Sequence, residues 1–376
     1  MKLLYISFLF VSFSAFVFSC STDKSNSQKD QKIISSPLFS FHESGDYRII
    51  HVFNDITHQD TLCTYVLYHR GNPRPQLSVP ALYVETPIES VACLSNIYVG
   101  ALMRLGLKDK IVAVDNGKNI FDPSVRDEVK RGKIQEIAVG DELDIERTVS
   151  LKPGIVFRYG SGDINKDLPA KLLEASVPVA VTLEFRETDP LLRASWLKFV
   201  AAFFEKEKLA DSILKQTSDS YYHLKQLTDT IAFRPTVFTE ILYQHTWFIP
   251  GGKSYVATLL KDAGATYLWQ DDTHEGSLPL SYESVFARAS NADFWLHVQY
   301  WKSKSDVIRL DDRNSMFRAY QENRIYNNDL RLSAEGAFDY WETGWISPDV
   351  VLKDLIKIFH PKLLPNHSFT YYRKLN

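Results

Sequence analysis

From Ser90 onward, short apolar runs alternate with segments of helical periodicity, and this alternation constrains the fold of the 376-residue chain more than any other feature. A strand followed by a helix, repeated, predicts a mostly parallel sheet that is covered by helices on both faces. Before residue 190 the strand-like runs are Val91–Leu94, Ile111–Val114, Ile155–Tyr159 and Val177–Leu183, and the helix-like segments are Val99–Leu107, Asp122–Arg131, Ile145–Ser150 and Asn165–Glu174.

Between Leu191 and Ile231 apolar residues recur at spacings of three and four, which predicts two helices separated near Glu205–Lys208. The second helix, of about 25 residues, would be roughly 38 Å long, which is the diameter of a domain. After Pro235 the α/β repeat resumes. Strands are expected at Thr236–Leu242, Thr246–Pro250, Phe294–Tyr300 and Arg324–Asn327, and helices at Ser254–Ala263, Tyr282–Ala289, Asn314–Glu322 and Pro348–Phe359.

The predicted fold class is therefore α/β, with two α/β lobes joined by a long helix and an N-terminal β appendage. The appendage is expected to be antiparallel, because alternating runs between Phe39 and Val84 are bounded by turn residues. Open α/β sheets bind ligands outside the carboxyl ends of their strands, so two facing lobes predict a cleft. The expected division is a signal peptide at 1–19, a flexible tether at 20–36, an N-terminal lobe with the appendage at 37–205, an interlobe helix at 206–231 and a C-terminal lobe at 232–376.

The first 19 residues have the pattern of a secretory signal. Lys2 precedes an apolar run from Leu3 to Phe18, which is shorter than the roughly 20 residues of a membrane span. Small and apolar residues before Cys20 and a polar tract after it resemble the lipobox of bacterial lipoproteins, in which the cysteine is diacylated. Cys20 is therefore the expected lipidation site, and its acyl chains would hold the protein on a membrane. An ordinary signal peptide that happens to contain a cysteine is the alternative.

Composition excludes some classes of partner and of fold. The 46 acidic and 43 basic residues give a formal charge of −3, and without a long basic run this balance argues against nucleic acid as a partner. Three cysteines are too few for a disulfide framework. Cys63 and Cys93 lie in strand-like runs, where buried thiols that pack as small hydrophobic side chains are the default, and a disulfide between them is the alternative.

Four groups of motifs follow one another in order between Ser90 and Lys374. They are Val91-Ala92-Cys93-Leu94-Ser95 with Leu105-Gly106 and Lys110-Ile111-Val112-Ala113-Val114; Leu151-Lys152-Pro153-Gly154-Ile155-Val156; Trp247 to Tyr255 with Ala263-Gly264; and Ser347-Pro348-Asp349 with Leu352-Lys353-Asp354-Leu355 and Phe359-His360-Pro361. Together they resemble the class III substrate-binding proteins of bacterial ABC importers, the cobalamin and iron-siderophore type, and more narrowly a lipoprotein branch common in Bacteroidetes. The order of the motifs carries this resemblance more than any single motif.

The resemblance implies a lipid-anchored protein of the cell envelope that faces the periplasm or the cell surface. It implies capture of an iron chelate (a siderophore) or a cobamide for import, without chemical change of the ligand. A haem-binding or metal-binding lipoprotein that hands its ligand to a TonB-dependent receptor is the alternative. The haem-binding branch usually has a ligating tyrosine after the second strand, where this chain has Phe121, so haem would need Tyr98 or His245 as its ligand.

Flat aromatic side chains suit a corrin, a porphyrin or a catecholate, because they stack on such rings and exclude water from them. The C-lobe candidates for ligand contact are Tyr243, Trp247, Tyr300, Trp301, Tyr340, Trp341 and Trp345, of which about three are expected to contact the ligand and some others to belong to the core. Gly251-Gly252-Lys253-Ser254 opens a helix after a strand, so Lys253 and Ser254 are candidates for an anionic or carbonyl group, and a purely structural turn is the alternative. The N-lobe candidates, from loops after strands, are Asn96, Tyr98, Asn116, Tyr159 and Arg186. Arg186 would pair with a carboxylate or phosphate, or else with a surface carboxylate of the chain itself.

The resemblance also bears on partners. In this family an acidic residue on the first helix of each lobe commonly pairs with arginines of the membrane permease. The corresponding positions here are Gly100 and Lys261, neither of which is acidic, so Asp109 or Asp262 would have to substitute. An ABC permease and an outer-membrane TonB-dependent receptor are therefore both candidate partners.

Two other classes of function find little support in the sequence. A zinc or manganese site across the cleft is disfavoured because no histidine lies between Ser90 and His223, although His245, His274 and His297 could meet in the C-lobe. An enzyme is disfavoured because GxSxG and HExxH motifs are absent and Asp271-Asp272 falls in an expected surface loop. We therefore expect no catalytic residue, no metal site and no resident cofactor.

Overall fold

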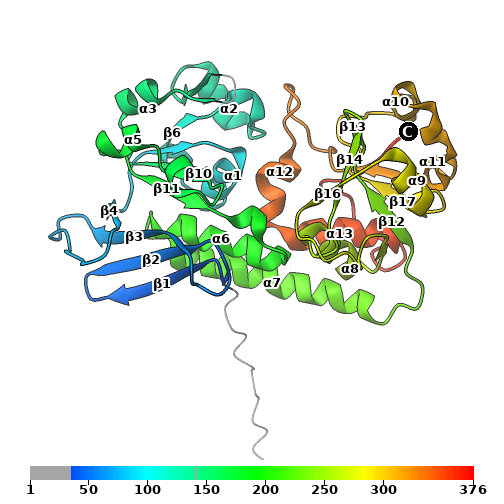
Figure 1. The fold of residues 1–376 in the computed structure, drawn as a ribbon, viewed down its shortest axis with the longest axis horizontal. Coiled ribbons are helices and arrows are strands. Elements are labelled where there is room, and N and C mark those ends of the chain that lie inside the picture. Colours follow the sequence, from blue (N-terminus) through cyan, green and yellow to red (C-terminus); the bar gives the residue numbers. More distant parts are fainter. Residues whose placement is uncertain (1–34, 140–141) are drawn as a thin grey trace, which may run out of the picture. The chain divides into compact units, whose positions relative to one another are not determined.

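The computed structural model describes residues 35–139 and 142–376, and it confirms the predicted fold class. Figure 1 shows an α/β lobe from each half of the chain and the helices that connect them. The predicted signal peptide, almost all of the predicted tether and Cys20 lie outside the described residues. Within the described ranges, no helix is both long enough and apolar enough to cross a bilayer.

The N-terminal appendage is a four-stranded sheet in the order β1-β2-β3-β4. Its strands are β1 (Phe39–Ser44), β2 (Tyr47–Phe53), β3 (Thr61–His69) and β4 (Leu82–Thr86). The first three strands are antiparallel, as predicted, but β4 runs parallel to β3. A parallel neighbour requires a crossover connection rather than a tight turn, and residues 70–81 provide one.

The N-lobe sheet has the order β11-β10-β5-β6-β7, and all its paired strands are parallel. The strands are β5 (Val91–Cys93), β6 (Ile111–Val114), β7 (Gln135–Glu136), β10 (Ile155–Tyr159) and β11 (Val179–Thr182), and β8 (Ala138–Val139) pairs with β9 (Glu142–Leu143) outside this sheet. The lobe's helices are α1 (Asn96–Arg104), α2 (Pro123–Lys130), α3 (Ile145–Leu151), α4 (Ile164–Asp167) and α5 (Ala170–Glu174), with 3-10 turns η1 (Lys108–Lys110), η2 (Gly117–Asn119) and η3 (Glu184–Arg186). The single helix predicted at Asn165–Glu174 is two short helices because Pro169, which has no N–H to donate, lies between them.

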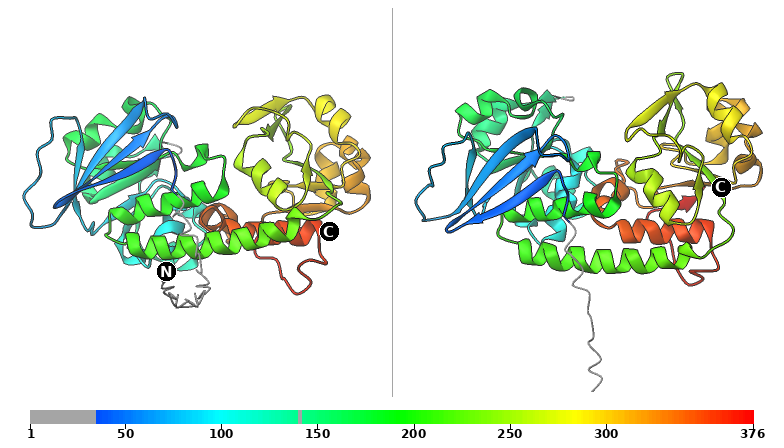
Figure 2. Two further views of the ribbon diagram at one scale, coloured as in Figure 1. Left: turned by 90° about the horizontal axis from the view of Figure 1, so that it is seen from below. Right: turned by 60° about the horizontal axis from the view of Figure 1, so that its bottom comes forward.

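Two helices follow the N-lobe sheet, as the spacing of apolar residues predicts. They are α6 (Pro190–Ala202) and α7 (Glu207–Asp229). The break between them includes Glu205, which has a left-handed backbone with φ of 56°. Helix α7 packs against α6 and also against α13 (Pro348–Phe359) of the C-lobe, so it spans both lobes (Figure 2).

The C-lobe sheet has the order β15-β12-β17-β18-β19, parallel except for β19. Its strands are β12 (Thr236–Thr239), β15 (Thr266–Tyr267), β17 (Phe294–Leu296), β18 (Ile325–Asn327) and β19 (Arg373–Lys374), and a separate antiparallel sheet contains β13 (Leu242–Tyr243), β14 (Thr246–Pro250) and β16 (Ser277–Leu280). The remaining helices are α8 (Tyr255–Asp262), α9 (Tyr282–Ala289), α10 (Lys304–Leu310), α11 (Arg318–Gln321) and α12 (Asp339–Thr343), with 3-10 turns η4 (Asp312–Met316) and η5 (Gly344–Ile346). The strand expected at Thr246–Pro250 therefore exists, but it belongs to the antiparallel sheet and not to the α/β repeat.

Two hydrophobic cores hold the fold, one dominated by the N-lobe with the appendage and one by the C-lobe. Cys63 and Cys93 lie buried in the first core as free thiols, so the alternative of a disulfide between them is wrong in this structure. Burial raises the pKa of the Cys63 thiol to about 12 and that of Cys93 well above its ordinary value. Both thiols are therefore uncharged packing groups at neutral pH.

Candidate functional site

The N-lobe sheet has a topological switch point between β5 and β10. The chain moves from β5 to β6 on one side, whereas it moves from β10 to β11 on the other. Connections that leave adjacent strands in opposite directions open a crevice at the carboxyl ends of those strands, which is where open α/β sheets bind ligands.

A pocket lies at this switch point, and we call it the strand-end pocket. Its volume is about 630 Å³, which is within the usual range of ligand pockets. Its lining comes from the segments after β5, β10 and β11: Ser95, Ile97, Arg158, Tyr159, Gly160, Ser161, Lys166, Asp167, Glu184, Phe185 and Arg186. The rings of Tyr159 and Phe185 are 55% and 46% exposed and meet edge to face at 6.4 Å, so they offer apolar surface to a ligand.

The loop after β10 is held rigid beneath this pocket. Asp167 is fully buried, and its carboxylate accepts hydrogen bonds from the backbone N–H groups of Ser161 and Gly162 at 2.7 and 2.9 Å and from the Ser161 hydroxyl. Gly162 has φ of 89°, and a Cβ at Gly160 would lie 2.4 Å from a methyl carbon of Val181. Both glycines are therefore required by the loop itself, one for its backbone conformation and one for its close packing.

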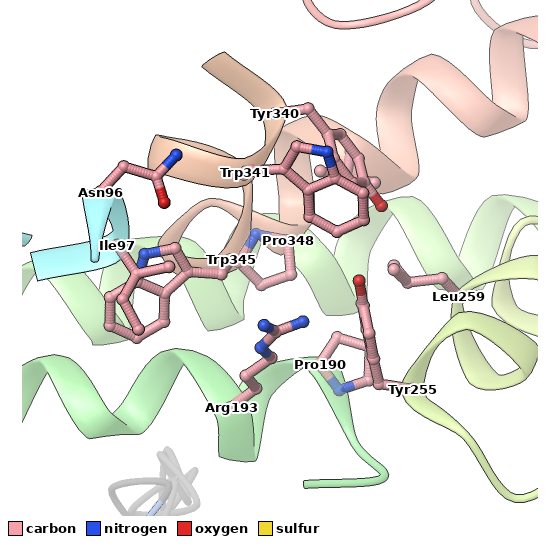
Figure 3. A pocket seen from close by; sticks show the side chains of 12 residues that line it. Asn96, Ile97, Pro190, Arg193, Tyr255, Leu259, Tyr340, Trp341, Trp345 and Pro348 are labelled. Carbon is pink, nitrogen blue, oxygen red and sulfur yellow. The ribbon is translucent and has the colours of Figure 1, made fainter. Parts of the chain in front are cut away.

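A second pocket, the aromatic pocket, lies next to the first and shares Ile97 with it. It is lined by Asn96, Ile97, Pro190, Arg193, Tyr255, Leu259, Tyr340, Trp341, Gly344, Trp345, Pro348 and Val351. These residues come from both lobes, and Figure 3 shows Arg193 extending from α6 between Tyr255 and the indole rings. Its volume is only about 160 Å³, so this pocket by itself can hold only a small part of a bulky ligand.

The C-lobe sheet has its own switch point, between β12 and β17, and polar residues with left-handed backbones follow both strands. Glu240 has φ of 68°, His297 of 58° and Gln299 of 54°. His297 is buried; its Nε2 lies 2.6 Å from the Tyr372 hydroxyl, and its Nδ1 lies 3.6 Å from Oε1 of Glu240. Left-handed backbone is unusual for residues other than glycine, and it clusters at sites that need fixed geometry.

Helix α12, which carries Tyr340 and Trp341 into the aromatic pocket, is attached to the N-lobe. The carboxylate of Glu342 accepts hydrogen bonds from the backbone N–H groups of Phe121 at 2.6 Å and Asp122 at 3.0 Å. Burial raises the pKa of Glu342 to about 7. Upstream of α12, Glu335 pairs with Lys130 and Arg126 of α2 at 2.9 and 3.4 Å.

The structure brings six of the predicted ligand contacts to the two pockets. Asn96, Tyr340, Trp341 and Trp345 line the aromatic pocket, and Tyr159 and Arg186 line the strand-end pocket. Arg186 makes no ion pair with the part of the chain that the structure describes; its guanidinium donates to the backbone carbonyls of Ser161 at 2.8 Å and Asn54 at 3.3 Å.

Three predicted contacts are buried in the cores instead. Trp247 has no exposed surface and donates to the Thr239 carbonyl, and Trp301 packs edge to face on Trp295. Tyr98 is also fully buried, with its hydroxyl 2.8 Å from that of Thr182. These predictions are wrong in this structure because large aromatic side chains beside short strands fill the core as readily as they line a cleft.

The ligand-binding role expected for the glycine turn before α8 is also corrected, because the polar groups of this turn are paired within the chain. The N–H groups of Gly251 and Lys253 donate to the carbonyls of Gly276 and His274 at 2.8 and 3.0 Å. Ser254 caps α8 through Ala257 N–H at 3.2 Å, and the Lys253 side chain is exposed outside both pockets. The structural turn, which was the alternative, is what the chain forms.

The remaining predicted contacts line neither pocket. Tyr243 and Tyr300 are exposed on the C-lobe, and Asn116 caps η2 by accepting from Lys118 N–H at 2.9 Å. Tyr98 and His245, the possible haem ligands, are respectively in the core and in the exposed turn between β13 and β14. Haem ligation by either residue in these pockets is therefore not supported.

The structure shows the surroundings of the residues that were considered for contact with a permease. A Cβ at Gly100 would lie 2.0 Å from the backbone oxygen of Glu342, so this face of α1 is covered by α12. Asp262 is buried and bonds to Lys225 at 2.7 Å and to the Tyr221 hydroxyl at 2.9 Å, whereas Asp109 is exposed. Of the two proposed substitutes, Asp109 is the exposed one, and its carboxylate lies 3.5 Å from Nζ of Lys110.

Within residues 35–139 and 142–376, no three His, Cys, Asp or Glu side chains gather in a way that could hold a metal ion. His297 bonds to Tyr372, and His274 lies 3.0 Å from Asp272 on the surface. The histidines of the C-lobe do not meet as a metal site would require.

Four residues that line the pockets were not predicted from the sequence: Arg193, Tyr255, Glu184 and Phe185. Arg193 had a recognisable signal, because it is a charged residue on a helix, α6, whose other residues are almost all buried and mostly apolar. Tyr255 follows the helix cap at Ser254 directly, so it enters the pocket from the first turn of α8.

Comparison with known proteins identifies the fold. Residues 91–331 match the family described as "Periplasmic binding protein". An uncharacterized lipoprotein of Methanocaldococcus jannaschii is 24% identical over 349 residues, which cover 89% of this chain and 80% of that protein.

Two solved structures share the architecture. A periplasmic binding protein of Veillonella parvula aligns with a TM-score of 0.57 and 14% identity, over 86% of this chain and 98% of that one. The apo form of the periplasmic heme-binding protein RhuT of Roseiflexus sp. RS-1 aligns with a TM-score of 0.56 and 19% identity, over 73% and 99%. At these identities the likeness concerns the fold alone.

Proposed function

Because this chain belongs to the periplasmic binding protein family, we propose that it captures an iron chelate or a cobamide for import and releases it unchanged. The observation that supports this most directly is the strand-end pocket at the N-lobe switch point together with the adjoining aromatic pocket, which shares Ile97 with it and draws on both lobes. Aromatic rings and guanidinium groups line these pockets, and this combination suits a ligand with flat rings and negative charge.

The sizes of the pockets favour a bulky ligand over a single ion or amino acid. The strand-end pocket can take the larger part of such a ligand, and the aromatic pocket, about a quarter of that volume, can take one projecting group. Asn96, Tyr159, Arg186, Tyr340, Trp341 and Trp345 are the contacts that we carry forward.

Haem is the second candidate, because the names of some proteins with the same fold describe them as heme-binding, from Roseiflexus, Vibrio cholerae and Pseudomonas aeruginosa. A haem would need a ligand other than Tyr98 or His245. Tyr159, which is exposed in the strand-end pocket, has the required phenolic oxygen.

We further propose that Cys20 carries the lipid anchor and that the body works at the cell envelope. The likeness to a lipoprotein of Methanocaldococcus jannaschii agrees with this proposal. Delivery to an ABC permease is the expected destination for a family member, and a TonB-dependent receptor is the alternative partner.

A binding panel tests the function. Purified full-length protein is titrated with ferric siderophores, cobalamins and haem while tryptophan fluorescence and ligand absorbance are recorded. We expect quenching at micromolar concentration by one class of ligand, which Trp341→Ala weakens and Phe233→Ala, a matched exposed aromatic outside the pockets, does not. The absence of binding by every class in the panel would refute the proposal.

A further inference from the structure

We infer that Arg193 binds a carboxylate of the ligand in the aromatic pocket. The inference rests on the proposed function and narrows it to ligands that carry a carboxylate next to an apolar ring. Arg193 projects from α6 into a pocket that is otherwise walled by aromatic, proline and aliphatic side chains and by Asn96 (Figure 3).

The guanidinium of Arg193 has no close anionic partner among the described residues. The residue is 9% exposed, its Nε makes no hydrogen bond, and the carboxylate nearest to it, that of Glu184, is 4.0 Å from Nη2. The other oxygen of Glu184 accepts a hydrogen bond of 2.6 Å from the Thr182 hydroxyl. A buried charge with so loose a partner is costly, and an anion that completes its hydrogen bonds would be strongly favoured.

Arg193 remains charged in this setting. Burial acts to lower the pKa of its guanidinium, but Tyr255 and Glu184 outweigh that effect and raise the pKa above its ordinary value. The positive charge is therefore a fixed feature of the pocket at any physiological pH.

The geometry favours a planar anion. The guanidinium carbon lies 4.5 Å from the centre of the Tyr255 ring, so the cation lies over this ring in the pocket that both side chains line. A carboxylate can accept two parallel hydrogen bonds from the N–H edge of a guanidinium. The indole rings of Trp341 and Trp345 also line this pocket and would contact the ring to which the carboxylate is attached.

Small matched probes test the inference without knowledge of the natural ligand. We choose 2-naphthoate, the uncharged 2-naphthamide and 2-naphthyl phosphate, and measure their binding to the full-length protein by ligand-observed NMR. We expect 2-naphthoate to bind at least tenfold more tightly than 2-naphthamide. The affinity of 2-naphthyl phosphate shows whether the pocket prefers a phosphate or a carboxylate. Tighter binding of 2-naphthyl phosphate than of 2-naphthoate would overturn the choice of a carboxylate.

Variants test whether Arg193 itself, rather than the overall charge of the protein, causes the preference for 2-naphthoate. Arg193→Gln is expected to abolish the preference for 2-naphthoate, and Arg193→Lys to retain part of it. Arg288→Gln is the control, because Arg288 also lies over an aromatic ring, that of Trp269, but is exposed and lines neither pocket.

Three further results would overturn the inference: equal binding of acid and amide by the wild type, no binding of 2-naphthoate, or an unchanged preference in a folded Arg193→Gln protein. The wild-type comparison needs no variant, so a folding defect does not leave the question open. If the ligand panel binds but the naphthoate preference is absent, the inference fails and the proposed function stands. If the preference is present but no panel member binds, the proposed function fails instead.

Discussion

The backbone N–H of Phe121 in the N-lobe donates a hydrogen bond of 2.6 Å to Oε2 of Glu342 on α12. The second oxygen of this carboxylate accepts from Asp122 N–H, and the side chain is buried with no cation beside it in the described chain. A carboxylate thus attaches the helix that lines the aromatic pocket to the opposite lobe.

Glu342 should make the stability of the fold depend on pH. Burial raises its pKa from 4.5 to about 7, so the folded state binds more protons than the unfolded state between these values. The free energy of unfolding should therefore fall as pH rises from about 4.5 to 7, by up to about 3 kcal/mol from this group, and then level off. Urea unfolding at pH 5 and pH 8 measures the change.

Glu342→Gln removes the titrating group and should reduce that loss of stability. Glu335→Gln is the matched control, because Glu335 is also in the segment near α12 but has a pKa lowered chiefly by its hydrogen bond to Lys130. An equal pH dependence in wild type and Glu342→Gln would contradict the assignment.

Trp341→Ala and Trp247→Ala should separate ligand contact from core packing. Trp341 lines the aromatic pocket, so its loss should weaken binding of the panel ligand by about 1–3 kcal/mol with little effect on stability. Trp247 is fully buried, so its loss should destabilise the fold by about 3–5 kcal/mol. Thermal unfolding and a fluorescence titration on both variants measure the two effects. A Trp247→Ala protein that is stable but no longer binds ligand would contradict the assignment of Trp247 to the core.

Gly100→Ala should loosen α12 from the N-lobe. The added Cβ would lie 2.0 Å from the backbone oxygen of Glu342, a separation that forces backbone movement. We expect a loss of stability of about 1–3 kcal/mol and faster hydrogen exchange at Phe121 and Asp122. Gly276→Ala, where a Cβ would meet nothing within 4 Å, is the control. Unchanged exchange in a folded Gly100→Ala protein would show that the contact does not hold the helix.

Cys20→Ser tests the lipid anchor. The variant should remain folded but leave the membrane fraction, because the anchor is covalent and precedes the globular body in the sequence. Fractionation of cells that express each form, with the fluorescence titration as a check on folding, gives the answer. A Cys20→Ser protein that stays with the membrane would exclude Cys20 as the anchor.

The sequence predicted the layout of the fold well because periodicity reports local structure directly. The helices at Tyr282–Ala289 and Pro348–Phe359 have the predicted bounds, and the break near Glu205 is where the charged run placed it. The parallel pairing of β4 and the antiparallel sheet around β14 were missed, because strand partners depend on contacts far apart in the chain.

The site was harder to predict, and the reason is visible in its residues. Trp247 and Trp341 are the same residue type and were both expected near strand ends or in loops, yet one fills the core and the other lines a pocket. Arg193 was missed because an arginine on a buried helix becomes informative only when its neighbours from the other lobe are known. Burial and pairing across the two lobes therefore decide the site, and a single sequence does not contain them.

The loop after β10, which lines the strand-end pocket, has a consequence for how fast a ligand is captured. The buried carboxylate of Asp167 accepts hydrogen bonds from the backbone N–H groups of Ser161 and Gly162, and these bonds maintain the loop before any ligand arrives. A pocket wall that is already in place requires little rearrangement on binding, so the association rate should be governed by diffusion and charge. Differences in affinity among ligands should then appear in their dissociation rates.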